Sequence, residues 1–206
     1  MRNSHYAAIC VAFFVCFTVM SFAVRSAHAG EATTQIKETV DAVIDVLNNK
    51  ELKKAEHKQE RRKKLREIVD RRFNFEEMAK RSLGLAWNKR TPAEKQEFVS
   101  LYSDLLENTY IRKIERYENE KVVYTAEKVE GPYAAVRTKV ITEKEVEIPV
   151  EYRIFKTASK WEVYDIIVEG VSLVNNYRNQ FGDIMKSGSY EVLVKKLKDK
   201  AKKESE

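Results

Sequence analysis

Residues 145–154 have the sequence EVEIPVEYRI, and this stretch decides the class of fold. Its even-numbered positions are all apolar or aromatic, and its odd-numbered positions are charged except for Pro149. Such alternation with a period of two is typical of a strand that buries one face and exposes the other. Pro149 stands on the charged face and cannot donate a backbone hydrogen bond, so it indicates an edge strand or a bulge.

Three neighbouring segments extend this strand into a sheet. Turn signals at Gly131-Pro132, at residues 142–144 and at residues 157–160 separate them, so consecutive strands are expected to pair antiparallel. The last segment is apolar on both faces and should therefore be covered on both sides. The pattern predicts four strands, at residues 121–129, 133–142, 145–157 and 160–169.

Helical patterns precede and follow the strands. The best local signal is Thr91-Pro92 with Glu94, which fits an N-cap, a first-turn proline and a capping box in front of a long apolar stripe that reaches Tyr110. Asn74 and Glu77 form a second capping signal, and Ser172 is placed to cap a helix after the sheet. The predicted helices are residues 34–48, a segment around 65–69, 75–83, the helix that starts after Thr91, 173–187 and 190–202.

The expected fold is therefore α+β, with a twisted antiparallel four-stranded meander and helices before and after it. A curved meander with helices across its concave side would enclose an apolar, cone-shaped pocket. No internal repeat divides the chain.

Residues 1–29 have the three parts of a cleavable secretory signal. Arg2 gives a basic start, residues 7–23 are apolar and uncharged, and Ala27-His28-Ala29 offers small residues at the two positions that a signal peptidase recognises. Cleavage is expected after Ala29. The alternative is a membrane anchor, although the apolar run is near the lower limit of about 17 to 25 residues for a span.

The residue types that remain after such cleavage exclude several kinds of chemistry. Cys10, Cys16, His5 and His28 all lie in the first 29 residues, so the remaining 177 of the 206 residues hold no cysteine and only His57. Disulfides, thiol nucleophiles, zinc sites built on Cys and His, and serine–histidine hydrolysis are thereby excluded. No phosphate loop, nucleotide fingerprint or calcium loop is present, so we predict neither a metal nor another cofactor.

The charge is moderately basic. The formal net charge is +6, and it falls to +4 without Arg2 and Arg25. Basic residues gather at 50–72 and 195–203, and such runs are usually solvated helix faces. The alternative is attraction to anionic lipid head groups or acidic partner surfaces. Nucleic acid is not an expected partner of an exported protein.

Asp165 and Tyr164 are the candidates for catalysis if the chain is an enzyme of the cone-fold type. Asp165 shares the predicted strand face with Trp161 and Val163, where an unpaired charge would be costly. We favour a structural carboxylate, satisfied by backbone amides or by Arg178. No enzyme is therefore predicted.

A pocket in an exported protein of this kind suits an apolar cargo. Each buried methylene contributes about 0.8 kcal/mol, so two acyl chains contribute on the order of 20 kcal/mol of gross transfer free energy. A carrier must therefore enclose such chains, whereas a head group can stay in water at the mouth. Binding costs and the apolar membrane that the lipid leaves offset much of this gain.

Several motifs, in their order and spacing, match a known family over about residues 34 to 186. The matching segments are FNFEEMAKR (Phe73–Arg81) with Leu83-Gly84 and Trp87, Thr91-Pro92 with Gln96 and Phe98, Thr109-Tyr110, WEVYDIIVEGVSL (Trp161–Leu173) and NYRNQF (Asn176–Phe181). Together they resemble the MlaC or toluene-tolerance auxiliary family.

The resemblance implies a soluble periplasmic carrier of glycerophospholipid that is not an enzyme. It implies acyl chains inside a cone similar to that of nuclear transport factor 2. The implied partners are phospholipid, an inner-membrane ABC transporter with an MCE-domain subunit, and an outer-membrane lipoprotein–porin complex. The expected organisation is a signal at 1–29, a lipid-binding domain at 30–188 and a basic C-terminal helix or tail at 189–206.

Fifteen apolar or aromatic residues are the candidates for the pocket wall. Leu105→Trp or Val150→Trp is expected to block lipid loading without unfolding the protein. Alternatives to a lipid carrier are a binder of a non-lipid apolar small molecule, the cone-fold enzyme and a protein-docking module. The motif positions are Tyr164, Ile166, Val168, Val171, Tyr177 and Phe181, and periodicity adds Met78, Leu83, Phe98, Leu105, Val136, Val140, Ile148, Val150 and Tyr152.

Overall fold

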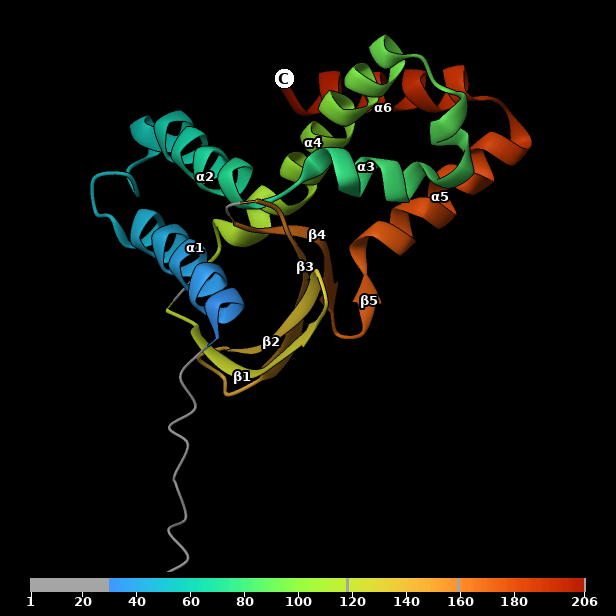
Figure 1. The fold of residues 1–206 in the computed structure, drawn as a ribbon. Coiled ribbons are helices and arrows are strands. Elements are labelled where there is room, and N and C mark those ends of the chain that lie inside the picture. The colour runs from blue at the N-terminus through green and yellow to red at the C-terminus, as the bar shows by residue number, and fades with distance from the viewer. Residues whose placement is uncertain (1–29, 118, 159, 206) are drawn as a thin grey trace, which may run out of the picture.

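A computed structural model describes residues 30–117, 119–158 and 160–205. The predicted signal, residues 1–29, lies outside the described residues, and the predicted cleavage point after Ala29 lies directly before the first of them. The helices and strands follow one another as expected for an α+β chain (Figure 1). In chain order they are α1 (Glu31–Asn48), η1 (Ala55–His57), α2 (Lys58–Arg72), α3 (Phe75–Leu83), η2 (Gly84–Lys89), α4 (Pro92–Ile114), β1 (Lys121–Glu130), β2 (Tyr133–Ile141), β3 (Glu147–Lys156), β4 (Trp161–Val168), β5 (Val171–Ser172), α5 (Leu173–Ser187) and α6 (Tyr190–Ser205).

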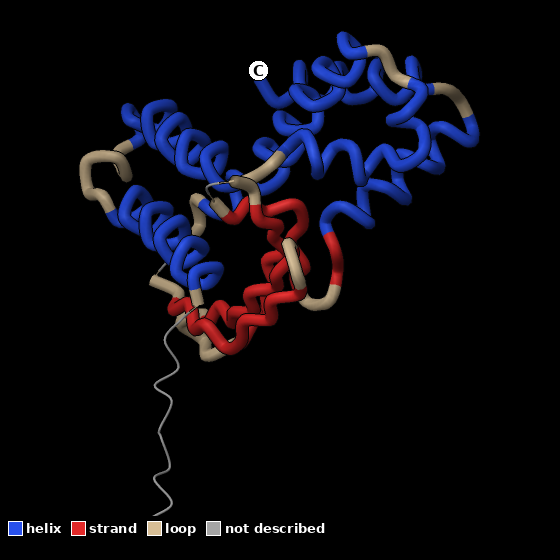
Figure 2. Tube along the Cα trace, viewed as in Figure 1, coloured by secondary structure: helices blue, strands red, loops and turns tan. Residues whose placement is uncertain are grey.

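The sheet confirms the predicted antiparallel meander. Its order is β1-β2-β3-β4-β5, so each strand pairs with its neighbour in the chain. The fifth strand was not predicted, because its two residues, Val171 and Ser172, are too few to show a period. Pro149 lies in β3, between β2 and β4, and so not on an edge strand as its residue type indicated. Figure 2 shows the strands curving beneath the first two helices.

An irregularity in β4 decides which side chains face inward. Arg153 and Ile154 are consecutive in β3, but their partners are Asp165 and Val163, so Tyr164 is an extra residue in β4. An extra residue reverses the alternation of faces beyond it. Val163 and Ile166 consequently line the same cavity, although a regular strand would place them on opposite faces. Asp165 therefore does not share a face with Val163 in the way that simple alternation predicts.

Helix caps form where the sequence places them. The Thr91 hydroxyl accepts from the Glu94 amide, and the Glu94 carboxylate accepts from the Thr91 amide, which completes the capping box of α4. The Asn74 side chain accepts from the amide of Glu77 at the start of α3. α4 extends to Ile114, one turn beyond the predicted stripe.

Two regions share the long helix α4. We call α3, η2, the first half of α4 (92–105), α5 and α6 the helical lobe. One continuous cluster of buried side chains fills it, including Phe98, Tyr102 and Phe181. α6 adds its own apolar face to this cluster. In Figure 1 these helices gather at the end of the molecule away from β1.

The second region is the cavity lobe, which consists of α1, α2, the second half of α4 (106–114) and the sheet. Leu106 belongs to the cluster of the helical lobe, and the other clustered buried side chains form two smaller groups. One lies between α1 and strands β2 to β4, and the other consists of Leu47, Leu65 and Ile111 where α1, α2 and α4 meet. Across residues 30–117, 119–158 and 160–205, no helix is both long enough and apolar enough to span a bilayer.

Candidate functional site

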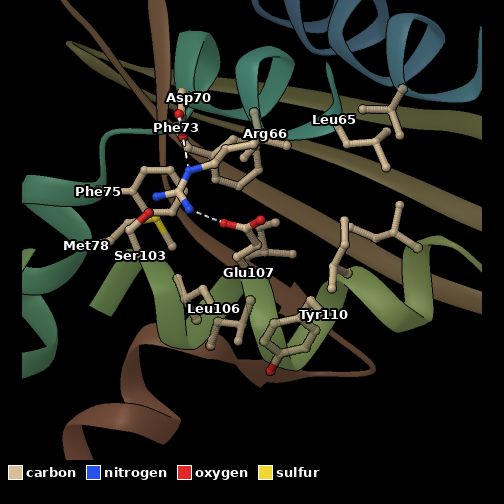
Figure 3. Close-up of a pocket in the computed structure, with 16 residues that line it drawn as sticks. Leu65, Arg66, Asp70, Phe73, Phe75, Met78, Ser103, Leu106, Glu107 and Tyr110 are labelled. Atoms are coloured by element: carbon tan, nitrogen blue, oxygen red, sulfur yellow. Dashed lines mark hydrogen bonds and ion pairs between the residues drawn. The ribbon is translucent and has the colours of Figure 1, made fainter. Parts of the chain in front are cut away.

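The cavity lobe contains two hollows that join. One, of about 140 Å³, lies among α2, α3, α4 and β4 (Figure 3). The other, of about 380 Å³, lies among α1, α4 and the sheet, and this volume falls in the range of about 300 to 1,000 Å³ typical of ligand pockets. Both are lined by the same residues where they meet, so they form one apolar space: Val43, Val69, Phe73, Tyr110, Ile114, Ile166 and Leu173.

Each surrounding element presents an apolar face to this space. On α4, Leu106, Tyr110 and Ile114 recur every four residues, which places them on one side of the helix. On α1, Val40, Val43 and other residues of the predicted apolar stripe do the same. The sheet contributes alternate residues of each strand, and the extra residue in β4 brings Val163, Ile166 and Val168 onto the cavity side: the sheet residues are Val122, Val140, Val150, Tyr152, Val163, Ile166 and Val168.

The polar groups of the wall are few and mostly paired. Arg72 donates to the Trp161 carbonyl at 2.8 Å and to the Thr39 hydroxyl at 3.0 Å, so its charge serves to join α2 to α1 and β4. Burial raises the pKa of Tyr152 to about 12, and burial beside Tyr177 raises that of Tyr110 to about 12. Both phenols therefore stay neutral at physiological pH and act as amphipathic wall residues.

Charges converge at one edge of the smaller hollow. Arg66 of α2 contacts Asp104 of α4 at 3.2 Å, Asp70 at 3.7 Å, and Glu107 of α4. Burial opposes the charge of Arg66, but Glu107 and Asp104 outweigh it and raise its pKa. The pairs with Asp104 and Glu107 join α2 to α4 beside the hollow.

The structure brings six of the fifteen predicted wall residues together around the cavity. The other nine lie elsewhere, and lipid contact by any of the fifteen stays a prediction. The six that line the cavity are Met78, Val140, Val150, Tyr152, Ile166 and Val168.

The remaining nine lie outside the lining of the cavity. Val136 is buried between the sheet and α1 without lining the cavity, and Ile148 is half-buried at the start of β3. Tyr164 packs against Tyr133 and Phe155, beneath the guanidinium of Arg81, and Val171 is exposed. Five form part of the cluster in the helical lobe: Leu83, Phe98, Leu105, Tyr177 and Phe181.

Sequence reasoning missed most of the helical wall. Leu65 and Val69 belong to α2, which was noted only as a more polar helix, since its apolar residues make a narrow stripe among many charges. Phe73 follows directly after α2 and bridges to Val163 of β4. Tyr110 was within the predicted stripe of α4, but the stripe passes from the packed cluster to the cavity without a sharp boundary, because Leu106 belongs to both. Nothing in the spacing marks this transition.

Asp165 has a structural role. Its carboxylate accepts from the Ser172 hydroxyl at 2.6 Å and from the Val174 amide at 3.0 Å, and the Ser172 oxygen accepts from the Asn175 amide. The carboxylate thus fastens β4 to the N-terminus of α5, using a backbone amide as expected and a serine in place of Arg178. Neither Asp165 nor Tyr164 lines the two hollows, so the geometry gives no support to the catalytic alternative.

Known proteins share this architecture. A solved structure of a phospholipid-binding protein from Ralstonia solanacearum, in complex with a phospholipid, aligns with a TM-score of 0.75 and 25% identity, covering 86% of this chain and all of that one. The intermembrane phospholipid transport system binding protein MlaC of Haemophilus influenzae is 23% identical over 133 residues, 62% of each chain. Toluene tolerance protein ttg2D of Pseudomonas putida is 29% identical over 98 residues, 47% of this chain and 46% of that protein.

The chain therefore spans less than two thirds of the curated relatives it matches. The family model of the MlaC protein, by contrast, matches residues 37–199, which include every helix and strand of the cavity lobe apart from the first turns of α1. The resemblance found in the motifs of α3, β4 and α5 is thereby confirmed. This chain belongs to the MlaC family.

Proposed function

We propose that this protein carries glycerophospholipids through the periplasm, with the acyl chains in the cavity and the head group at its opening. The observation that carries the proposal is the continuous apolar space between α1, α2, α4 and the sheet. A relative of the same fold was solved in complex with a phospholipid, which supports this choice of cargo over a smaller apolar molecule.

The physical chemistry of the wall fits acyl chains. Burial of methylene groups is non-directional, so a wall of Val, Ile, Leu, Phe and Tyr suffices to hold them. Arg72, a polar residue of this wall, is paired within the protein with Trp161 and Thr39 and so does not require a polar group of the acyl chains as its partner. These features support a transport function.

The proposed partners follow from the family. We propose exchange with an inner-membrane ABC transporter that has an MCE-domain subunit and with an outer-membrane lipoprotein–porin complex, after export and cleavage behind Ala29. Nucleic acid has no part in this function.

Lipid analysis of the exported protein tests the proposal. The full chain is expressed in a Gram-negative host and purified from the periplasm without detergent, and native mass spectrometry is followed by extraction of the bound molecules. We expect a protein that begins at Gly30 and carries one diacyl phospholipid. A folded, empty protein that takes up no lipid from vesicles would contradict the carrier function and favour a non-lipid ligand.

A further inference from the structure

The charges beside the smaller hollow form a mixed cluster. Arg66 is the single cation, and Asp70, Asp104 and Glu107 are the anions that contact it. Arg66, Asp70 and Glu107 also line the hollow, whose other walls are almost entirely apolar. In Figure 3 the guanidinium of Arg66 lies between Asp70 and Glu107. The Arg66 side chain is 40% exposed and that of Glu107 25%, so the cluster borders both solvent and cavity.

The sign of this cluster is opposite to that of the protein. One guanidinium and three carboxylates give it a formal charge of −2, whereas the whole chain carries +6. Arg61 and Arg62 lie further along the same seam between α2 and α4 and are both paired with Glu115, and Arg62 is also attracted by Glu107. Neither arginine lines the hollow. Adding these two cations and one anion changes the formal charge from −2 to −1, so the edge of the cavity is still anionic in a basic protein.

We propose that this cluster selects phospholipids with a zwitterionic head group that combines a phosphate and a primary ammonium, as in phosphoethanolamine. The proposal rests on the proposed carrier function. Such a head group can insert between Arg66 and its partners, because the phosphate accepts from the guanidinium and the ammonium donates to Glu107 and Asp104. Every charge of the protein then keeps an opposite charge beside it.

An anionic head group does not have this property. A phosphoglycerol group would bring its anionic phosphate to Arg66 but has no cation for the carboxylates that it displaces. Glu107 and Asp104 would then lie beside the phosphate without an opposite charge. Like charges about 4 Å apart repel by roughly 1 kcal/mol even in water, and by more beside a low-dielectric cavity. The cluster thus discriminates by the carboxylates that the ligand displaces, while the apolar wall holds either lipid.

The test is competitive loading from vesicles that contain equal amounts of phosphatidylethanolamine and phosphatidylglycerol. The exported protein is incubated with them and repurified, and the ratio of bound lipids is measured. We expect the wild type to prefer phosphatidylethanolamine about fivefold. Asp104→Asn combined with Glu107→Gln should bring the ratio of bound phosphatidylethanolamine to phosphatidylglycerol close to one.

A matched double variant controls for net charge. Asp183→Asn with Glu130→Gln makes the same chemical changes at two exposed ion pairs outside the cavity. Both double variants become more basic by two charges, which increases their attraction to anionic vesicles equally. The control should keep the wild-type ratio. If Asp104→Asn/Glu107→Gln unfolds, the single change Asp70→Asn replaces it and should lower the preference about twofold.

The possible failures are distinct. A wild type that loads both lipids equally, or a cluster variant that keeps the wild-type preference, overturns the head-group proposal and leaves the ion pairs as a structural link between α2 and α4. A wild type that loads no phospholipid of either kind overturns the carrier function as well.

Discussion

The helical lobe and the cavity lobe use aromatic residues in opposite ways. In the helical lobe, Phe98, Tyr102 and Phe181 lie with ring centroids 5.7 to 6.2 Å apart, and each ring is covered by the others. In the cavity lobe, Phe73 and Tyr110 border open space. Since packed interiors resemble crystals in density, the first arrangement stabilises the fold and the second encloses a volume. The same residue types therefore stabilise the fold in one lobe and line the cavity in the other.

The largest expected effect is a difference in how much stability a ring contributes in each lobe. Phe98→Ala removes a fully buried ring from the helical lobe and should lower the free energy of unfolding by about 3 to 5 kcal/mol. Phe73→Ala, at the half-buried cavity wall, should cost clearly less, because the space beside it is already empty. Urea unfolding of both variants measures the difference. Equal losses would mean that the cavity wall contributes to stability as the packed cluster does.

The second test compares how the two lobes respond to a larger side chain. Leu105 is 7% exposed within the helical cluster, so Leu105→Trp overpacks it and should cost about 1 to 3 kcal/mol. This differs from the expectation drawn from periodicity, which treated Leu105 and Val150 alike. Val150 lines the cavity, so Val150→Trp should fill part of it and abolish lipid loading at nearly wild-type stability. Denaturant midpoints and bound lipid are measured on both proteins; normal lipid content in Val150→Trp would remove that residue from the site.

The third test concerns how the cavity lobe is closed. Arg61 and Arg62 each bind Glu115 at 2.8 Å, which joins α2 to the end of α4. Burial raises the pKa of Glu115, but the hydrogen bonds and charges of Arg62 and Arg61 outweigh it and hold the pKa below its ordinary value of 4.5. Glu115→Gln should lower the free energy of unfolding by roughly 1 to 2 kcal/mol at neutral pH, between the values for exposed and buried pairs.

The pH dependence checks the cause. A lowered folded-state pKa stabilises the protein above the ordinary pKa, and this contribution is lost as pH falls through the folded-state value. The stability difference between wild type and Glu115→Gln should therefore shrink below about pH 4. Glu60→Gln, an exposed change on α2, is the control and should show a much smaller difference at neutral pH. A difference that persists in acid would assign the effect to packing.

The smallest expected effect lies at the start of α4. Thr91→Ala removes the capping box at the helical-lobe end of the helix and should cost about 1 kcal/mol, with lipid loading unchanged. Thr91→Ser retains the hydroxyl and should restore most of the loss. If Thr91→Ala reduces lipid content per folded molecule, the two ends of α4 are more tightly coupled than the comparison of the lobes implies.

Local signals were sufficient to predict the long helices and the four long strands of the fold. The alternation in residues 145–154, the capping box at Thr91 and the caps at Asn74 and Ser172 all correspond to observed structure, because each depends on residues close in sequence. The two-residue strand β5 and the interior position of Pro149 were not predictable in this way. Both depend on which strands pair, and pairing is a property of the whole sheet.

The cavity was predictable only in part. Period identifies the apolar face of an element but not whether another side chain fills the space opposite that face. Phe98 and Tyr110 belong to one stripe of α4, yet the first meets Phe181 and the second borders the cavity. Tyr164 shows the other cause, since one extra residue in β4 changed the face of every residue after it. Such a shift appears only in the register with β3.

The position of α4 across both lobes has a consequence for the history of the protein. Its first half is fixed by the packed cluster, whereas Tyr110 and Ile114 in its second half line the cavity. Substitutions at these two positions change the shape of the cavity and leave the buried rings of Phe98 and Tyr102 in place. Natural selection can thus alter the lining by single steps while the first half of the helix continues to stabilise the fold.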